Sequence, residues 1–297
     1  LEQKNKRSII RWVADNNGVV RIGTRLDYGS ASNYERIWHR KPKGKDFTLI
    51  QKVDYFDHNL MHPFRFDKDN DNHLLVTTDN LMEGKELLND DDEGIYIYDL
   101  NENKIIGSYE NKIKRQVKSL LKNTFKEKQL DFVSANESDS LHVVSVFSDV
   151  SPVEYFLFNL ESRKLSHLGS EYPQLKEESL RPMLEVNFKA SDGKEIPGFL
   201  TLPEGSAKPW PLVVYPHGGP WARDRWGFDN YVQFLASRGY AVFQPQFRGS
   251  TGYGKAHLEA GYGEWGNLIQ EDITDGINWL IEEGKVDPNR ICIMGSS

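Results

Sequence analysis

Near residue 183 the apolar pattern of this 297-residue chain changes its period. Residues 1–182 contain short aromatic and β-branched runs paired around polar turns, a pattern typical of β-hairpins. Residues 183–297 begin with one hairpin around Asp192-Gly193 and then alternate apolar strands with helical segments. Such alternation favours a parallel, doubly wound sheet covered by helices. The sequence therefore predicts two domains of different class, which meet between residues 182 and 183.

Two hairpins in the first half superpose without a gap. Asp99 and Asn159 hold the same position in them, at a spacing of 60 residues (159 − 99). Repeated four-stranded units of ~40–50 residues are typical of propeller blades, so the longer spacing requires insertions. We expect insertions at residues 79–93 and in the basic stretch 112–128, and the second of these is expected to form a short exposed helix. The first half therefore predicts three or four blades of an incomplete β-propeller, with further blades upstream of residue 1.

In the second half, strands are predicted at residues 211–215, 241–244 and 291–294, and helices at 228–237 and 267–283. The second helix carries isoleucine every fourth residue from position 269 to 281, which makes one apolar stripe. Gly284 stands where a left-handed C-terminal cap belongs. The single cysteine, Cys292, excludes an internal disulfide and is expected to be a small core residue of the last strand.

A glycine-rich turn, His217-Gly218-Gly219-Pro220, lies between the first of these strands and the first helix. Glycines in such a turn let backbone N–H groups approach a substrate oxyanion. We therefore predict that the backbones of Gly218 and Gly219 form an oxyanion hole. His217 is expected on the substrate side, orienting this loop rather than acting as general base, because in α/β-hydrolases the base follows the nucleophile along the chain.

The last three residues, Gly295-Ser296-Ser297, follow an apolar strand. Their order matches the first half of a G-x-S-x-G nucleophile elbow, in which the serine sits on a tight strand-to-helix turn. Ser297 is therefore the predicted nucleophile, and Ser296 is the alternative in another register. The tripeptide alone says little, so the prediction depends on the apolar strand and the glycine turn that precede it.

A second glycine-rich loop, residues 247–254, follows the second parallel strand. In open α/β sheets ligands bind at the carboxyl ends of the strands, so Arg248 and Tyr253 are candidate substrate contacts. The alternative is a structural loop in which Arg248 pairs with a helix carboxylate, Asp272 or Asp275. The sequence leaves both interpretations open.

The net charge of −7 disfavours nucleic acid as a partner. No apolar run approaches the ~20 residues that span a bilayer, so no membrane association is expected. Residues 67–78 resemble a calcium loop, but Asn72 and Thr78 replace its glycine and glutamate, which favours a solvated turn. No metal and no organic cofactor are expected. A cytoplasmic location is expected, and a periplasmic or secreted one stays open because the natural N-terminus is expected upstream of Leu1.

These motifs together resemble the prolyl oligopeptidase family of serine peptidases, most closely its acylaminoacyl-peptidase branch. The resemblance rests on residues 183–297, through Ser191-Asp192-Gly193, Ile196 to Pro203, His217 to Pro220, Phe247 to Gly254 and Gly295-Ser296-Ser297. It implies an α/β-hydrolase catalytic domain capped by a β-propeller, with Ser297 as nucleophile and the Gly219 N–H as an oxyanion donor. The catalytic acid and base would follow residue 297, so residues 1–297 by themselves would be inactive.

The resemblance further implies hydrolysis of short peptides through an acyl-enzyme, without a cofactor. Short peptides are therefore the expected partners, and a homo-oligomer stays open. A dipeptidyl-peptidase-like exopeptidase is the nearest alternative, followed by an esterase of the same fold. From another class comes a non-catalytic propeller protein with a degenerate hydrolase domain.

Overall fold

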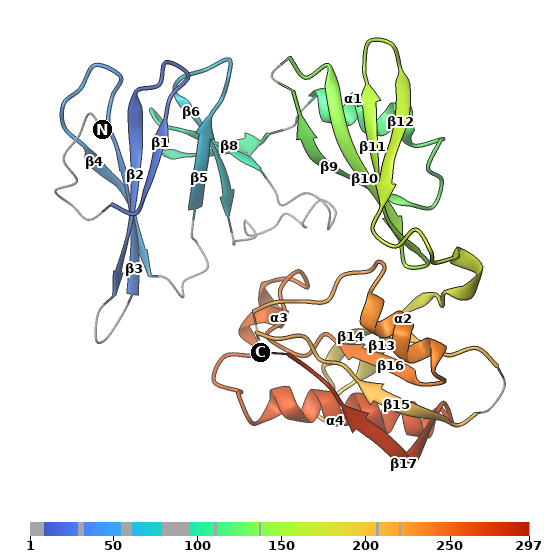
Figure 1. Ribbon diagram of the computed structural model, residues 1–297. Helices are drawn as coiled ribbons and strands as arrows, with labels where there is room; N and C mark the ends of the chain where they lie inside the picture. The colour runs from blue at the N-terminus through green and yellow to red at the C-terminus, as the bar shows by residue number, and fades with distance from the viewer. Residues whose placement is uncertain are drawn as a thin grey trace. The chain divides into compact units, whose positions relative to one another are not determined.

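The computed structural model describes residues 9–28, 33–54, 61–78, 95–109, 112–136, 138–205, 208–219 and 221–296. The chain separates into two compact units, Leu1–Asn111 and Lys112–Ser297 (Figure 1). The second unit contains one of the β-sheets of the first half together with the α/β region. The domain boundary after residue 182 stays a prediction, as does the insertion at residues 79–93, which lies outside the described residues.

Three four-stranded antiparallel sheets occupy the described part of the first half, and in each the strands pair in chain order. The first contains β1 (Arg11–Ala14), β2 (Val20–Tyr28), β3 (Asn33–His39) and β4 (Thr48–Asp54). The second contains β5 (Met61–Phe66), β6 (His73–Thr78), β7 (Tyr96–Asp99) and β8 (Lys104–Ser108). The third contains β9 (Gln129–Ala135), β10 (Leu141–Ser148), β11 (Ser151–Asn159) and β12 (Lys164–Ser170). Such four-stranded meanders are what propeller blades consist of.

The two superposed hairpins are the third and fourth strands of their sheets, β7–β8 and β11–β12. Their turns have the same local structure, because the Asp99 side chain accepts the Glu102 N–H and the Asn159 side chain accepts the Ser162 N–H, both at 2.9 Å. Near the end of each turn a residue adopts the left-handed conformation, with φ 55° at both Asn103 and Arg163. Similar side chains at corresponding positions thus give the same turn.

Each sheet buries one apolar face. In the first unit the core comes from both sheets and includes Val13, Ile22, Ile37, Met61, Phe66, Leu74, Val76 and Tyr98. The third sheet packs against α1 (Lys112–Leu121), whose Val117 and Leu121 are buried. The basic stretch therefore does form a helix, but one of its faces belongs to the core and only the lysine-rich side is exposed.

The α/β region contains a five-stranded sheet in the order β13-β14-β16-β15-β17. Its strands are β13 (Met183–Lys189), β14 (Glu195–Thr201), β15 (Trp210–Val214), β16 (Ala241–Pro245) and β17 (Val286–Ile293). The last three run parallel, and the β13–β14 hairpin adds antiparallel to β16. A 3₁₀ turn, η1 (Glu177–Ser179), precedes this sheet.

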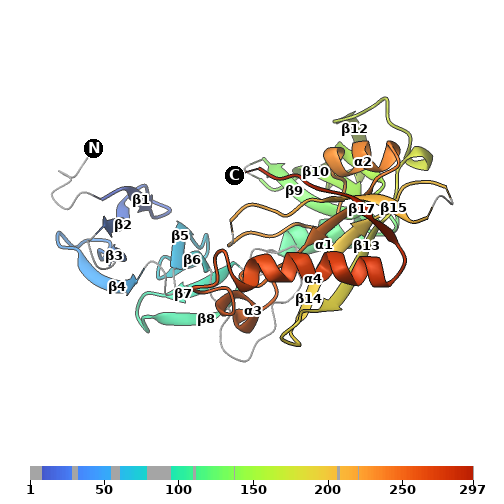
Figure 2. The ribbon, with the colours of Figure 1, turned by 90° about the horizontal axis from the view of Figure 1, so that it is seen from below.

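Helices cover both faces of this sheet. α2 (Asn230–Ser237) connects β15 to β16, while α3 (Lys255–Glu259) and α4 (Leu268–Glu282) connect β16 to β17. Figure 1 shows α2 and α4 on opposite faces, and Figure 2 shows α4 lying along one of them. The apolar stripe of α4 packs on the sheet through Ile269, Ile273 and Leu280. Gly284 ends this helix with φ 63°, as predicted.

β17 corrects one expectation. Cys292 is exposed rather than buried. Among the described residues β17 pairs with β15 alone, and no described element covers the Cys292 side chain.

Within the second unit, the third sheet is joined to the α/β region through Gln233 of α2. The Gln233 Nε2 donates to Arg181 O at 2.7 Å and to Asp149 O at 3.1 Å, while its Oε1 accepts the Arg181 N–H at 2.8 Å. The Asp149 carboxylate in turn accepts the Met183 N–H at 2.8 Å. Both side chains thus hold the strand connection from β12 to β13.

Candidate active site

The β15–α2 loop, residues 215–229, begins with His217. Its Nδ1 lies 2.7 Å from Gly218 O and therefore donates, because a carbonyl oxygen only accepts. Its Nε2 lies 2.9 Å from Ser250 Oγ, and its ring stacks on Phe247 at 4.4 Å. Burial lowers the pKa of His217, although the Gly218 hydrogen bond opposes this, so the imidazole is neutral near pH 7.

This hydrogen bond sets the direction of the next peptide group. In a trans peptide the C=O and the N–H point to opposite sides, so fixing Gly218 O also fixes where the Gly219 N–H points. Gly219 has φ 130°, and a Cβ there would lie 2.8 Å from Trp221 N. Only glycine fits this bend. Among the described residues, neither the Gly218 N–H nor the Gly219 N–H has a hydrogen-bond partner, so both remain available to a ligand.

The end of the chain approaches this loop. Beyond β17 the Met294 N–H donates to Val214 O at 2.9 Å, which continues the pairing to the end of β15. A Cβ on Gly295 would lie 3.5 Å from Pro216 O, directly before His217. Ser297 and Pro220 lie outside the described residues, so the structure brings together Gly295 and the His217 turn, and the nucleophile itself stays a prediction.

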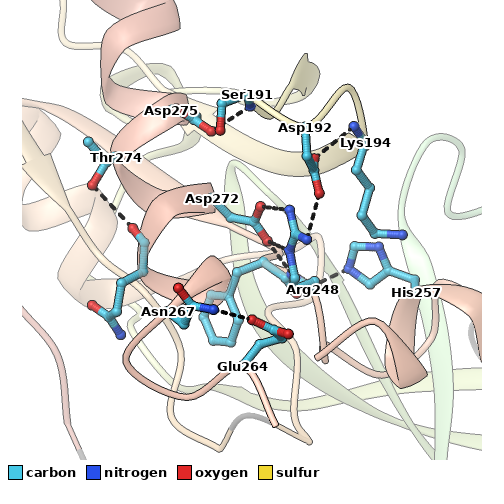
Figure 3. Close-up of polar contacts among 12 residues, drawn as sticks. Ser191, Asp192, Lys194, Arg248, His257, Glu264, Asn267, Asp272, Thr274 and Asp275 are labelled. Atoms are coloured by element: carbon cyan, nitrogen blue, oxygen red, sulfur yellow. Dashed lines mark hydrogen bonds and ion pairs between the residues drawn. The ribbon is translucent and has the colours of Figure 1, made fainter. Parts of the chain in front are cut away.

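The β16–α3 loop, residues 246–254, holds Arg248 in a buried ion-pair network (Figure 3). Arg248 donates to Asp272 of α4 from Nη2 at 2.6 Å and from Nε at 2.9 Å. A third bond runs from Nη1 to Asp192 at 2.8 Å. The Asp272 hydrogen bond is the main cause that raises the pKa of Arg248, and its guanidinium lowers the pKa of Asp192.

This arrangement is the structural alternative foreseen for Arg248. Its guanidinium is committed to two carboxylates, and the other predicted helix partner, Asp275, instead accepts the Ser191 N–H at 2.7 Å. A direct contact of Arg248 or Tyr253 with substrate stays a prediction. Tyr253 is half-buried at the same loop, with its ring 5.5 Å from that of His257.

Two residues beside the His217 and Arg248 loops, Ser250 and His257, were not predicted from the sequence. Ser250, fully buried, stands within hydrogen-bond reach of both His217 Nε2 and Phe247 O, the latter at 2.7 Å. His257 of α3 approaches Gln246 O and Phe247 O at 3.0 and 3.1 Å, and burial lowers its pKa. A serine after an Arg-Gly pair and a histidine on a short helix are common, so only their contacts distinguish them.

The calcium-like segment forms a polar turn. Asp67 Oδ1 accepts the Asp69 N–H at 3.0 Å, and the Asn70 side chain accepts the Asn72 N–H at 2.9 Å. Within the described ranges, no group of three or more His, Cys, Asp or Glu side chains is placed to hold a metal ion. None of the described helices is long and apolar enough to cross a membrane.

Residues 226–297 match the family described as the prolyl oligopeptidase family. This confirms the resemblance stated from the motifs. The match begins after the His217 turn, and it includes the β16–α3 loop and the final Gly295-Ser296-Ser297 segment.

Curated relatives that the chain matches include both dipeptidyl and acylaminoacyl enzymes. Dipeptidyl aminopeptidase BIII of Pseudoxanthomonas mexicana is 38% identical over 167 residues, which are 54% of this chain and 24% of that protein. Acylamino-acid-releasing enzyme of Arabidopsis thaliana is 34% identical over 87 residues, 29% of this chain and 11% of that protein. The chain thus spans a quarter or less of these relatives.

Solved structures of the same fold match nearly the whole chain. Puromycin hydrolase has a TM-score of 0.62 at 17% identity, covering 96% of this chain and 48% of that one. Pyrococcus horikoshii acylaminoacyl peptidase has a TM-score of 0.56 at 18% identity, covering 93% and 46%. These likenesses concern the fold, and they confirm propeller blades followed by part of an α/β-hydrolase domain. The chain spans about half the length of these structures.

Proposed function

We propose that the protein to which this chain belongs is a serine peptidase that hydrolyses short peptides through an acyl-enzyme on Ser297. The approach of Gly295 to Pro216 is the observation that carries this proposal. Gly295, the first glycine of the predicted nucleophile turn, thereby lies beside the loop of Gly218 and Gly219, whose N–H groups have no hydrogen-bond partner among the described residues. Nucleophile and oxyanion donors side by side are what acyl transfer requires.

In the proposed reaction, the Ser297 hydroxyl attacks the peptide carbonyl carbon while a histidine beyond residue 297 takes its proton. The carbonyl oxygen becomes an oxyanion that accepts the Gly219 N–H, with the Gly218 N–H beside it. The amine then leaves with the proton, and water hydrolyses the ester on Ser297 by the same route. His217, neutral and bonded to Gly218 O, takes no part in proton transfer and orients the donor.

We further propose which part of the enzyme residues 183–297 and residues 1–182 each supply. Residues 183–297 supply the N-terminal half of the catalytic domain, ending at the nucleophile elbow. Residues 1–182 supply part of the propeller, which restricts access to short peptides. No cofactor is required for this chemistry.

A dipeptidyl-peptidase-like activity is the second candidate. It is favoured by the 38% identity to dipeptidyl aminopeptidase BIII and by 31% identity over 207 residues to dipeptidyl peptidase family member 6 of Caenorhabditis elegans. Matched peptide amides with a free or an acetylated α-amino group separate the two. Cleavage two residues from a free N-terminus supports the dipeptidyl candidate, and release of an acetylated first residue supports the acylaminoacyl one.

The test is covalent labelling of the full-length protein with a fluorophosphonate serine probe. We expect a labelled band in the parent and in Ser296→Ala, and none in Ser297→Ala. Label that persists in Ser297→Ala but disappears in Ser296→Ala would move the nucleophile by one residue. A folded parent that takes no label contradicts the catalytic proposal and leaves the non-catalytic binding protein.

A further inference from the structure

Gln246, which directly follows β16, forms side-chain hydrogen bonds to the main chain of the β15–α2 loop. Gln246 Oε1 accepts the Asp224 N–H at 3.2 Å, and Gln246 Nε2 donates to Asp224 O at 2.8 Å. The side chain thus satisfies both main-chain polar groups of Asp224, as a paired strand would. Gln246 is fully buried, and its own N–H donates to Pro197 O of β14 at 2.9 Å. The hydrogen bonds from Gln246 to Asp224 therefore connect the β15–α2 loop to the sheet.

A second glutamine, two positions earlier on β16, faces the same aspartate. The Gln244 side chain hydrogen-bonds the Asp224 carboxyl, while Asp224 Oδ2 and Gln244 Oε1 are buried without a partner among the described residues. Burial raises the pKa of Asp224 to about 7, and the nearby Asp229 carboxylate acts in the same direction. A proton on Oδ2 would let it donate to Gln244 Oε1, which satisfies both atoms in an acid–amide pair.

The β15–α2 loop is thus held at three places against the residues that follow β16. His217 attaches its first part, because its Nε2 lies 2.9 Å from Ser250 Oγ and its ring stacks on Phe247. The Thr251 N–H donates to Ala222 O at 3.0 Å, and Gln246 holds Asp224. The proposed donor, the Gly219 N–H, lies between the first and the other two attachments. A donor held from both sides needs no reorganisation when the oxyanion forms, which is the condition for strong electrostatic catalysis.

We propose that Gln246 is a positioning residue for the oxyanion donor Gly219, acting through its two hydrogen bonds to the main chain of Asp224. The proposal rests on the function proposed above. Gln246 does not touch the substrate. Without its grip, the segment after Gly219 relaxes away from the β16–α3 loop and the N–H is no longer aimed at one point.

The first test is Gln246→Met in the full-length protein, a change that keeps the side-chain length but removes both hydrogen bonds. We expect kcat to fall by about 10- to 100-fold, since a displacement of about 1 Å in a catalytic group can cost about a hundredfold. KM should stay within about threefold, because the lost interaction forms only in the transition state. The matched control is Gln270→Met, the same change at an exposed position of α4.

A readout specific to positioning is the affinity for a peptide aldehyde, which forms an oxyanion on the enzyme. Its inhibition constant should rise in proportion to the loss in kcat/KM. A purely structural role for Gln246 would lower stability without this proportionality. A folded Gln246→Met protein with the parent's kcat and aldehyde affinity overturns the proposal.

The second variant, Gln246→Glu, tests the positioning role of Gln246 if the methionine variant does not fold. A protonated glutamic acid can both accept the Asp224 N–H and donate to Asp224 O, whereas its carboxylate only accepts and repels that oxygen. The ratio of variant to parent kcat/KM should therefore rise as the pH falls, and a ratio independent of pH contradicts the grip. A parent without fluorophosphonate labelling rejects the proposed function itself, which separates the two failures.

Discussion

At the scale of single residues, ion pairs with Asp272 and Asp192 stabilise the buried charge of Arg248. Its side chain is 4% exposed and that of Asp272 is fully buried. Removing the guanidinium would leave the Asp272 carboxylate without its ion-pair partner in the core. We expect Arg248→Met to lower the free energy of unfolding by about 3–5 kcal/mol, as for other buried pairs that lose one partner. Urea unfolding followed by tryptophan fluorescence measures it.

The matched control is Arg290→Met. Arg290 also bonds an aspartate, Asp287, at 2.7 Å, but its side chain is 53% exposed. An exposed pair is worth at most about 1 kcal/mol, so this variant should unfold nearly like the parent. Equal losses in both variants would show that burial of the Arg248 pair is not what matters.

At the scale of elements, α4 lies unusually close to the sheet at Gly276. A Cβ there would lie 2.6 Å from Phe243 Cε1 and 2.9 Å from Phe188 Cζ, so the helix can approach only because glycine occupies this position. Alanine usually favours a helix by about 1 kcal/mol over glycine. We nevertheless expect Gly276→Ala to destabilise the protein by about 1–3 kcal/mol, because overpacking of a tight core outweighs the helical preference.

Thermal unfolding of Gly276→Ala and of Asn278→Ala separates these two effects. Asn278 lies on the exposed side of the same helix, where alanine adds helical preference without a clash. The melting temperature should fall for the first and stay level or rise slightly for the second. A stabilised Gly276→Ala protein would show that α4 can move away from the sheet at little cost.

At the scale of the whole molecule, we expect the hydrogen bonds of Gln233 to couple the unfolding of the third sheet to that of the α/β region in the second unit. Gln233→Met leaves the N–H and C=O of Arg181, together with Asp149 O, without a partner. A buried unpaired group costs about 1–3 kcal/mol, and these groups are only partly buried, so a loss of about 1–3 kcal/mol in total is expected. Hydrogen exchange should then speed up along residues 171–183 before the strands on either side. Uniform exchange in the variant would contradict this.

The first unit should lose stability in mild acid through His39. Burial and then the neighbouring Arg21 and Lys41 lower the pKa of His39 from 6.5 to about 4. Its Nε2 accepts from the Arg21 guanidinium at 3.0 Å, so the ring must be neutral. Between pH 6.5 and about 4, the unfolded chain binds a proton that the folded one does not. The free energy of unfolding therefore decreases as the pH is lowered from 6.5 to about 4.

Replacing His39 by glutamine keeps an acceptor for Arg21 without a titrating group. We expect urea midpoints of His39→Gln to depend less on pH between about 4 and 6.5 than those of the parent. His167→Gln, at an exposed histidine of β12, is the control and should keep the parent's slope. A parental slope in His39→Gln would assign the acid sensitivity to other groups.

The elements of this protein follow from local sequence. The two hairpins that contain Asp99 and Asn159 were predicted because alternation and turn chemistry act within a few residues, and the same holds for the isoleucine stripe of α4 and its cap at Gly284. The family motifs likewise lie in contiguous segments. For this reason the fold class and the candidate oxyanion loop were visible without any coordinates.

Contacts between distant segments were decided by the tertiary structure alone. The sequence left Arg248 with two interpretations, because nothing near it says whether its guanidinium contacts a substrate or pairs with Asp272, 24 residues away. It placed Cys292 in the core, whereas the side chain is exposed among the described residues, because a strand's composition does not reveal which of its faces other elements cover. The grip of Gln246 on Asp224 joins two loops 22 residues apart. Local propensity determines elements, whereas pairing across the chain depends on which elements pack together.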